Sequence, residues 1–294
     1  MNYAFPFPIA LNLNVLRSNP DQYVHGPRDV EPVNLERMRT WAPNADEAAT
    51  GMLAACEGVA RGRSGAWRDS RPGLLALMTT LPGRPYNGLY GLDATASPED
   101  ATALAVDLAA SGVSWCARLR PSVPDEVDEA LGDQGLFAED EALLMAASLT
   151  ANDFERFEPP ELTLTARRSG DDPAIATVLC AAFGTEPSSA AKLLDSAHLK
   201  CEGIQWHLGR VGDKPVACAM SVMAGGALGI FAVGTVPEAR GRGYGSAVTS
   251  RALTQGLAAG AGFGVLTASP DVQNVYLRLG FRVLERWRRL VPWL

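Results

Sequence analysis

The sequence predicts an α/β protein built from two similar halves. Segments in which apolar and polar residues alternate, as in strands, are interspersed with segments in which apolar residues recur at helical spacing. In the second half, a glycine-rich segment around residue 243 separates a strand pattern from a helix pattern. The order of strand, helix, strand and short helix occurs once before, in the first half, which indicates a diverged internal repeat. We therefore expect two related units, residues 1–155 and 156–294.

Composition and charge exclude several classes of protein. The net charge of −7 argues against a general nucleic-acid binder, because neutralising phosphates requires a basic surface. The apolar N-terminal arm has no basic residue before it and is interrupted by Pro6 and Pro8, unlike a signal peptide. The five cysteines lack metal-ligand spacing, so we expect reduced thiols and no metal. These features predict a cytoplasmic monomer or homodimer that binds neither nucleic acid nor a membrane.

The first half should contain most of the elements of the repeat. Asn44 and Glu47 form a capping pair that starts an amphipathic helix through Ala60. Residues 61–73, rich in Gly, Arg and Ser, predict an exposed loop, and the polar segment 150–161 predicts a linker. The remaining expectations are a short helix over 35–41, strands over 74–80 and 88–93, a helix capped by Ser97, a strand over 113–119, a short helix over 124–131 and a strand over 142–149.

The second half repeats this order with an insertion. A central strand over 228–233 leads into the glycine-rich loop 240–246 and an amphipathic helix, and the tail 282–294 reads as a strand with a solvated face. The first half lacks the loop and the first turns of its helix. The other expected elements are strands over 162–166, 205–211, 216–223 and 265–267, and helices over 171–183 and 187–197 and before Gly280.

The loop is suited to binding a phosphate. Glycine stands at every second position from 241 to 245, so the backbone can turn tightly and point its N–H groups at a ligand. The following helix contributes the partial positive charge of its N-terminus, and Arg240 and Arg242 add cations. A P-loop is excluded because the segment contains no lysine. A dinucleotide fold is disfavoured because Ser246 stands where its third glycine belongs and no acidic residue lies between Glu238 and Asp271.

The loop resembles that of the GCN5-related N-acetyltransferase (GNAT) superfamily, whose pattern Arg240, Gly243 and Gly245 match. The strand at 265–267 and the Tyr-x-x-x-Gly-Phe segment ending at Phe281 follow in the family's order, so the resemblance covers the second half. It implies a mixed, mostly antiparallel sheet flanked by helices and splayed at its central strand. It also implies acetyl-CoA as co-substrate. The first half resembles a degenerate GNAT copy that completes a shared sheet or walls off the acceptor site.

The resemblance also implies roles for individual residues. Tyr276 is the candidate general acid that protonates the departing thiolate, with core packing as the alternative. Ser269 either contacts the pantetheine arm or caps the short helix. No general base stands out: His207 and Glu238 are possible, as are a water chain or an amine that arrives neutral. The expected cofactor-binding residues are Val233, Thr235, Arg240, Gly241, Arg242, Gly243, Tyr244, Gly245, Ser246 and Ser269.

These residues together predict an N-acetyltransferase. The expected reaction transfers acetyl from acetyl-CoA to the primary amine of a small molecule, by direct attack in a ternary complex. No cysteine or serine is paired with a histidine in a nucleophile motif, so no covalent acyl-enzyme is expected. The alternative is a GNAT-like protein that binds an acyl-CoA and either decarboxylates it or senses it without acetylating an amine.

Overall fold

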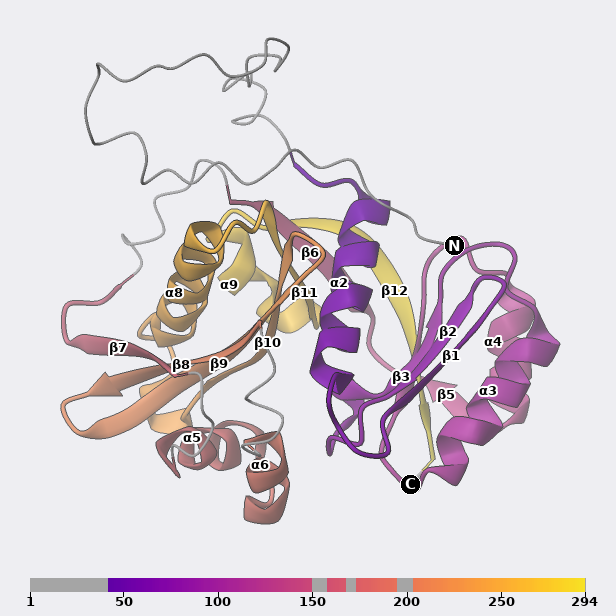
Figure 1. Cartoon of the computed structure of the whole chain (residues 1–294), viewed down its shortest axis with the longest axis horizontal. Helices are drawn as coiled ribbons and strands as arrows, with labels where there is room; N and C mark the ends of the chain where they lie inside the picture. Colours follow the sequence, from indigo (N-terminus) through magenta and orange to yellow (C-terminus); the bar gives the residue numbers. More distant parts are fainter. Residues whose placement is uncertain (1–41, 150–157, 168–172, 195–202, 294) are drawn as a thin grey trace, which may run out of the picture. The chain divides into compact units, whose positions relative to one another are not determined.

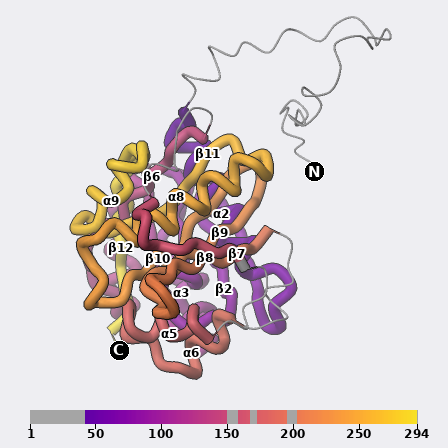
Figure 2. The backbone as a smooth tube through the Cα atoms, turned by 90° about the vertical axis from the view of Figure 1, so that its left-hand side faces the viewer, coloured from indigo at the N-terminus to yellow at the C-terminus, as the bar shows by residue number. Residues whose placement is uncertain are grey.

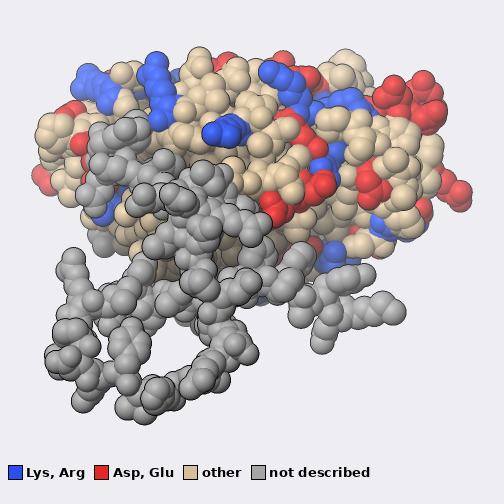
Figure 3. Space-filling model, turned by 90° about the horizontal axis from the view of Figure 1, so that it is seen from above, with Lys and Arg blue, Asp and Glu red and all other residues tan. Residues whose placement is uncertain are grey.

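A computed structural model describes residues 42–149, 158–167, 173–194 and 203–293. These residues fall within one compact unit, Trp41–Leu294. The expected N-terminal arm, the helix over 35–41, most of the linker and the start of the helix at 171 lie outside the described residues. No helix of the described part is long and apolar enough to cross a membrane. On the face shown in Figure 3, basic and acidic side chains are interspersed.

The described strands form one twelve-stranded sheet, which is mixed and largely antiparallel. Its order is β1-β2-β3-β4-β12-β6-β11-β10-β9-β8-β7, and β5 pairs with β12. Among the described strands, only β3 with β4 and β10 with β11 run parallel, and a helix connects the members of each parallel pair. The predicted fold class is therefore confirmed. The strands are β1 Trp67–Arg71, β2 Leu74–Met78, β3 Gly88–Gly91, β4 Cys116–Leu119, β5 Leu136–Ala138, β6 Ala142–Ser148, β7 Leu162–Arg167, β8 Ile204–Val211, β9 Lys214–Ala224, β10 Ala227–Thr235, β11 Phe263–Ala268 and β12 Arg282–Pro292.

Helices cover both faces of the second-half strands. Helix α8 lies on one side of β8 to β10, and α5 and α6 lie on the other (Figures 1 and 2). Helix α2 packs against β9 and β10 as well as β2, and Gly51 makes this approach possible because a Cβ there would lie 2.8 Å from that of Ala227. The helices are α2 Ala45–Ala60, α3 Pro98–Ala110, α4 Asp125–Asp133, α5 Pro173–Phe183, α6 Pro187–Leu193, α8 Tyr244–Ala258 and α9 Gln273–Leu277.

The two halves exchange their last strands. Strand β6, from the first half, lies between β11 and β12. Strand β12 pairs with β6 over Arg282–Trp287 and then continues between β4 and β5. The tail is thus a strand, as predicted. It lies in the middle of the sheet with Trp287 fully buried, while Arg282 and Arg286 are exposed, which agrees with the predicted solvated face.

The first half has its own core on the far side of α2. Helices α3 and α4 pack on β2, β3 and β5, around residues such as Leu104 and Val127. The predicted exposed loop over 61–73 is wrong in part, because Trp67–Arg71 pair with Leu74–Met78 as edge strand β1. Strand β1 alternates half-buried and exposed residues, but all of them after Trp67 are polar. The sequence therefore lacks the apolar alternation that would have predicted a strand.

Candidate functional site

The central strand β10 separates from its parallel neighbour halfway along its length. It pairs with β11 only over Ala227–Gly229. The register with β9 then shifts between Phe231 and Gly234, and Ala232 takes a left-handed backbone with φ of 49°. Such a bulge bends a strand and ends its pairing. Beyond Gly229 the β11-facing edge of β10 has no strand partner among the described residues, so its backbone groups can bind an extended ligand.

The loop after β10 forms an open turn. Gly241 and Gly243 have φ of 78° and 82°, values that L side chains rarely adopt. A Cβ at either position would meet no atom within 4 Å, so the space in front of the turn is open. Gly243 precedes the first residue of α8, where no side chain caps the helix. The first-turn N–H groups of α8 therefore remain available as donors to an anion.

The open turn and the separated edge of β10 line one cavity of about 650 Å³. Nine predicted cofactor or catalytic residues line it: Val233, Thr235, Arg240, Gly241, Gly243, Tyr244, Gly245, Ser246 and Tyr276. Arg242 is exposed and does not line it, and Ser269 lines a second cavity instead. Sequence reasoning missed Asn274 and Arg278, which also line the first cavity. They stand four residues apart, a spacing that places two side chains on one face of a helix, and this was the available signal.

Two of the predicted binding side chains are engaged elsewhere. Arg240 donates from Nε to the carbonyl of Thr235 (3.3 Å) and from Nη2 to the carbonyl of Ala182 (3.1 Å), which ties α5 to the end of β10. The buried Tyr244 donates its hydroxyl to Glu161 Oε1 (3.0 Å). The side chains of both residues are therefore held by contacts within the protein.

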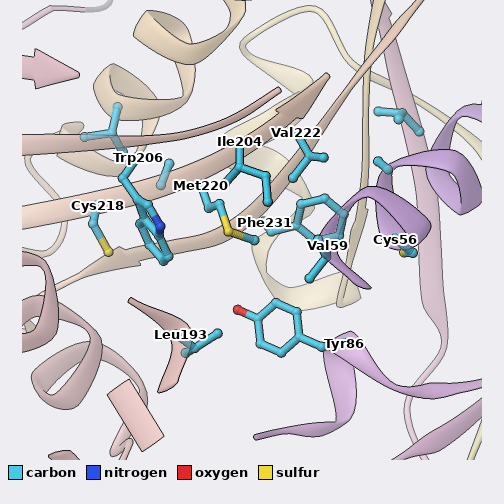
Figure 4. Packing of buried hydrophobic residues seen from close by; sticks show 14 of the residues in the cluster. Cys56, Val59, Tyr86, Leu193, Ile204, Trp206, Cys218, Met220, Val222 and Phe231 are labelled. Carbon is cyan, nitrogen blue, oxygen red and sulfur yellow. The ribbon is translucent and has the colours of Figure 1, made fainter. Parts of the chain in front are cut away.

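A second cavity, of about 440 Å³, adjoins the first. The two cavities share Phe183, Val233, Val272 and Tyr276 as lining residues. Segment Pro82–Tyr86 of the first half contributes to the second cavity, and Figure 4 shows Tyr86 projecting from that half toward Leu193 and Phe231. Ser269 lines this cavity, and its side chain does not cap the 3₁₀ turn that follows.

Tyr276 lies on α9 where the two cavities meet. Its side chain is 9% exposed and its ring contacts Phe281 edge-on, with centroids 5.9 Å apart. Burial raises the pKa of Tyr276 to about 12, because the phenolate would lose its hydration. The phenol therefore keeps its proton at neutral pH. The ring packs in the core, as one interpretation expects, and the residue also lines both cavities, so its role as general acid stays a prediction.

The two candidate bases do not line either cavity. His207 is fully buried on β8, and its Nε2 lies 2.8 Å from Ser221 Oγ. Burial, with a smaller contribution from Arg251, lowers the pKa of His207 to about 3. His207 is therefore a neutral core residue, and its candidacy as a base was wrong. Glu238 lies exposed in the 3₁₀ turn Pro237–Ala239, outside both cavities.

The described residues contain no group of three or more His, Cys, Asp or Glu side chains arranged to hold a metal ion. What the site offers instead is an uncapped helix start, an open strand edge, a buried phenol and two adjoining cavities. The uncapped start of α8 suits a phosphate group, and the open edge of β10 suits the amide groups of a long ligand. The phenol can donate a proton or a hydrogen bond at the junction.

Comparison with solved structures identifies the fold. A GCN5-related N-acetyltransferase from Kribbella flavida matches with a TM-score of 0.62 and 19% identity, over 85% of this chain and 96% of that one. A GCN5-related N-acetyltransferase-like protein from Streptococcus suis matches with a TM-score of 0.57 and 12% identity, over 87% and 98%. A tandem GNAT protein from the clavulanic acid biosynthesis pathway matches with a TM-score of 0.54 and 12% identity, over 87% and 92%.

Comparison at the sequence level supports the same assignment for the second half. A search of curated proteins found no match. The model of the acetyltransferase (GNAT) family matches residues 171–281, which include β10, the glycine loop, α8, β11 and α9. The protein thus has the GNAT fold, and the segment that lines the first cavity is the one that matches the acetyltransferase (GNAT) family.

Proposed function

We propose that the protein transfers acetyl from acetyl-CoA to the primary amine of a small molecule. The observation that carries this proposal is the junction of the two cavities at Val233 and Tyr276. A donor in the first cavity and an acceptor in the second would meet there, beside the phenol. This arrangement favours direct transfer in a ternary complex, because proximity and orientation replace a covalent enzyme intermediate.

The residues of the first cavity fit acetyl-CoA. The uncapped N-terminus of α8 and the open turn at Gly241 and Gly243 supply backbone donors for a pyrophosphate. The unpaired edge of β10 at Val233 and Thr235 can bind the amides of the pantetheine arm as an added strand would. The exposed Arg278 adds a cation at the same cavity. No metal is required by this chemistry.

The chemical step needs one proton donor and one proton acceptor. The amine nitrogen attacks the thioester carbonyl carbon, a C–N bond forms and the C–S bond breaks. The departing sulfur takes a proton from Tyr276, and the proton released by the amine passes through water to restore the phenol. Because neither His207 nor Glu238 lines the cavities, we propose that the amine enters the step already neutral or loses its proton to water.

The lining of the second cavity by residues of both halves supports a small-molecule acceptor. Its lining combines Tyr86 from the first half with Leu193 and Phe231 from the second. We propose that the first half is a degenerate GNAT copy that retains the parallel pair β3 and β4 but has no glycine loop, and that it now closes the acceptor side. A cavity bounded by both halves leaves less room for a protein side chain presented on a surface.

Calorimetric titration with acetyl-CoA, followed by an assay of thiol release with and without a panel of primary amines, tests this function. We expect binding, and thiol release that depends on an amine. Binding without thiol release under any condition would replace the proposal with an acyl-CoA sensor. Loss of carbon dioxide from a carboxyacyl-CoA without thiol release would replace it with a decarboxylase. Absence of binding would overturn the enzyme assignment.

A further inference from the structure

The described lining of the second cavity is apolar except for one carboxylate and a few neutral polar groups. Its charged side chain is Glu186, and no Lys, Arg or His of the described residues lines it. Burial raises the pKa of both lining tyrosines, Tyr86 and Tyr276, so they stay neutral. The apolar lining residues include Pro82, Pro85, Phe183, Leu193 and Phe231. A guest of this cavity should have an apolar body and carry a positive charge.

Glu186 is free to bind that charge. It lies exposed between α5 and α6, and its carboxylate neither caps α6 nor forms an ion pair within the described residues. The segment that carries it leaves α5 at Phe183, whose ring lies against the β10 bulge: a Cβ on Gly234 would be 2.7 Å from Phe183 Cε2. The carboxylate therefore belongs to a segment that begins at the junction of the two cavities.

The wall that the first half contributes is held by hydrogen bonds within that half. Buried Asn87 donates from Nδ2 to the carbonyls of Leu81 (2.8 Å) and Gly83 (3.2 Å), and its Oδ1 accepts from the backbone N–H of Thr79 (2.8 Å). Pro82 and Pro85 restrict the same segment further. A wall of this kind limits the size of the guest instead of adapting to it.

We infer that the acceptor is a primary amine on an apolar, ring-sized body that carries no carboxylate of its own, and that Glu186 selects it by attracting the ammonium group. This inference rests on the proposed function. The amine binds as the ammonium ion and releases its proton to water before attack. A carboxylate on the acceptor would be repelled by Glu186 and would find no cation among the described lining residues.

Phenethylamine and phenylalanine are suitable probes, because they share the ring and the amine and differ by the carboxylate. Their binding to the full-length protein saturated with CoA is measured by calorimetry, which requires no turnover, and their acetylation by thiol release. We expect phenethylamine to bind at least about tenfold more tightly than phenylalanine. Glu186→Gln should weaken phenethylamine binding roughly fivefold, the size typical of an exposed ion pair, and reduce the discrimination between the two probes.

Glu129→Gln is the matched control, since it removes the same charge from an exposed position on α4 outside both cavities. It should leave binding of both probes unchanged. Equal affinities for phenethylamine and phenylalanine, or an equal loss of phenethylamine binding in Glu186→Gln and Glu129→Gln, would overturn the inference. Acetylation of other amines in that case would leave the proposed function intact. Selective binding of phenethylamine without thiol release would support the inference and count against acetyl transfer.

Discussion

At the scale of single residues, Tyr276 both packs in the core and lines the two cavities. Its ring packs against Phe281. A phenol whose pKa is raised to about 12 stays protonated through the neutral range, so it is in the form that a general acid requires. The same burial makes the phenol a weak acid. In the proposed reaction, its contribution as a general acid therefore depends on proton return from the attacking amine.

Replacing Tyr276 with Phe removes the hydroxyl and keeps the ring. We expect kcat to fall about 100-fold, within the range typical of a lost general acid, while the Kd of acetyl-CoA and the Tm stay close to those of the parent. In the parent, ionisation of Tyr276 should not reduce activity below about pH 11, because its pKa is about 12. A variant with unchanged kcat would leave Tyr276 only its packing role.

At the scale of elements, the loop between β10 and α8 acts through its backbone. Gly243 has φ of 82° and ψ of 3°, and a Cβ there would meet no atom within 4 Å. Substitution therefore acts through backbone conformation, at a cost of about 1–2 kcal/mol for an ordinary L residue, and not through a clash. The arginines differ from it, since Arg240 is tied to Thr235 and Ala182 and Arg242 is exposed outside the cavity.

We therefore expect Gly243→Val to weaken acetyl-CoA binding by more than about tenfold and Arg242→Ala by less than about fivefold, as measured by calorimetry. The matched control is Gly243→Asn, because asparagine tolerates the left-handed region better than valine. It should retain more binding than Gly243→Val. Equal affinities of Gly243→Val and Arg242→Ala for acetyl-CoA would mean that the backbone conformation at Gly243 does not direct the N–H groups of the loop at this ligand.

At the scale of the whole molecule, the exchange of β6 and β12 makes each half depend on the other. Strand β6 supplies the neighbour of β11, and β12 supplies the strand between β4 and β5. The ion pair between Arg120 and Glu285 (2.8 Å) adds a link between the first half and β12. A chain divided at the sequence-predicted boundary would leave each fragment's part of the sheet without a strand that the other fragment supplies.

Fragments 1–155 and 156–294, produced separately, should each fail to unfold cooperatively in denaturant, because unpaired strand edges and apolar faces would be exposed. Mixed or co-expressed, they should assemble into a stable complex that binds acetyl-CoA. Size-exclusion chromatography and circular dichroism report both properties. Cooperative unfolding of either fragment alone would show that it forms an independent domain.

Sequence by itself determined the local elements and the glycine loop that lines the first cavity. Alternating apolar residues and caps such as Asn44 placed most strands and helices, and the glycines at 241 and 243 indicated the open turn before α8. These features are local, since a cap or a glycine acts within a few residues of itself. The splay of β10 followed from the resemblance, and the pairing limited to Ala227–Gly229 agrees with it.

Only the tertiary structure decided which distant segments meet. The position of β12 between β4 and β6 depends on pairing across more than a hundred residues, for which the sequence carries no periodic signal. The burial of His207 and of the Tyr244 ring follows from packing within the second half, and the contribution of Tyr86 to the second cavity follows from how the two halves pack. The alternation along a strand shows on which face of the sheet a residue lies, but only the packed fold shows which residues surround it and whether water reaches it.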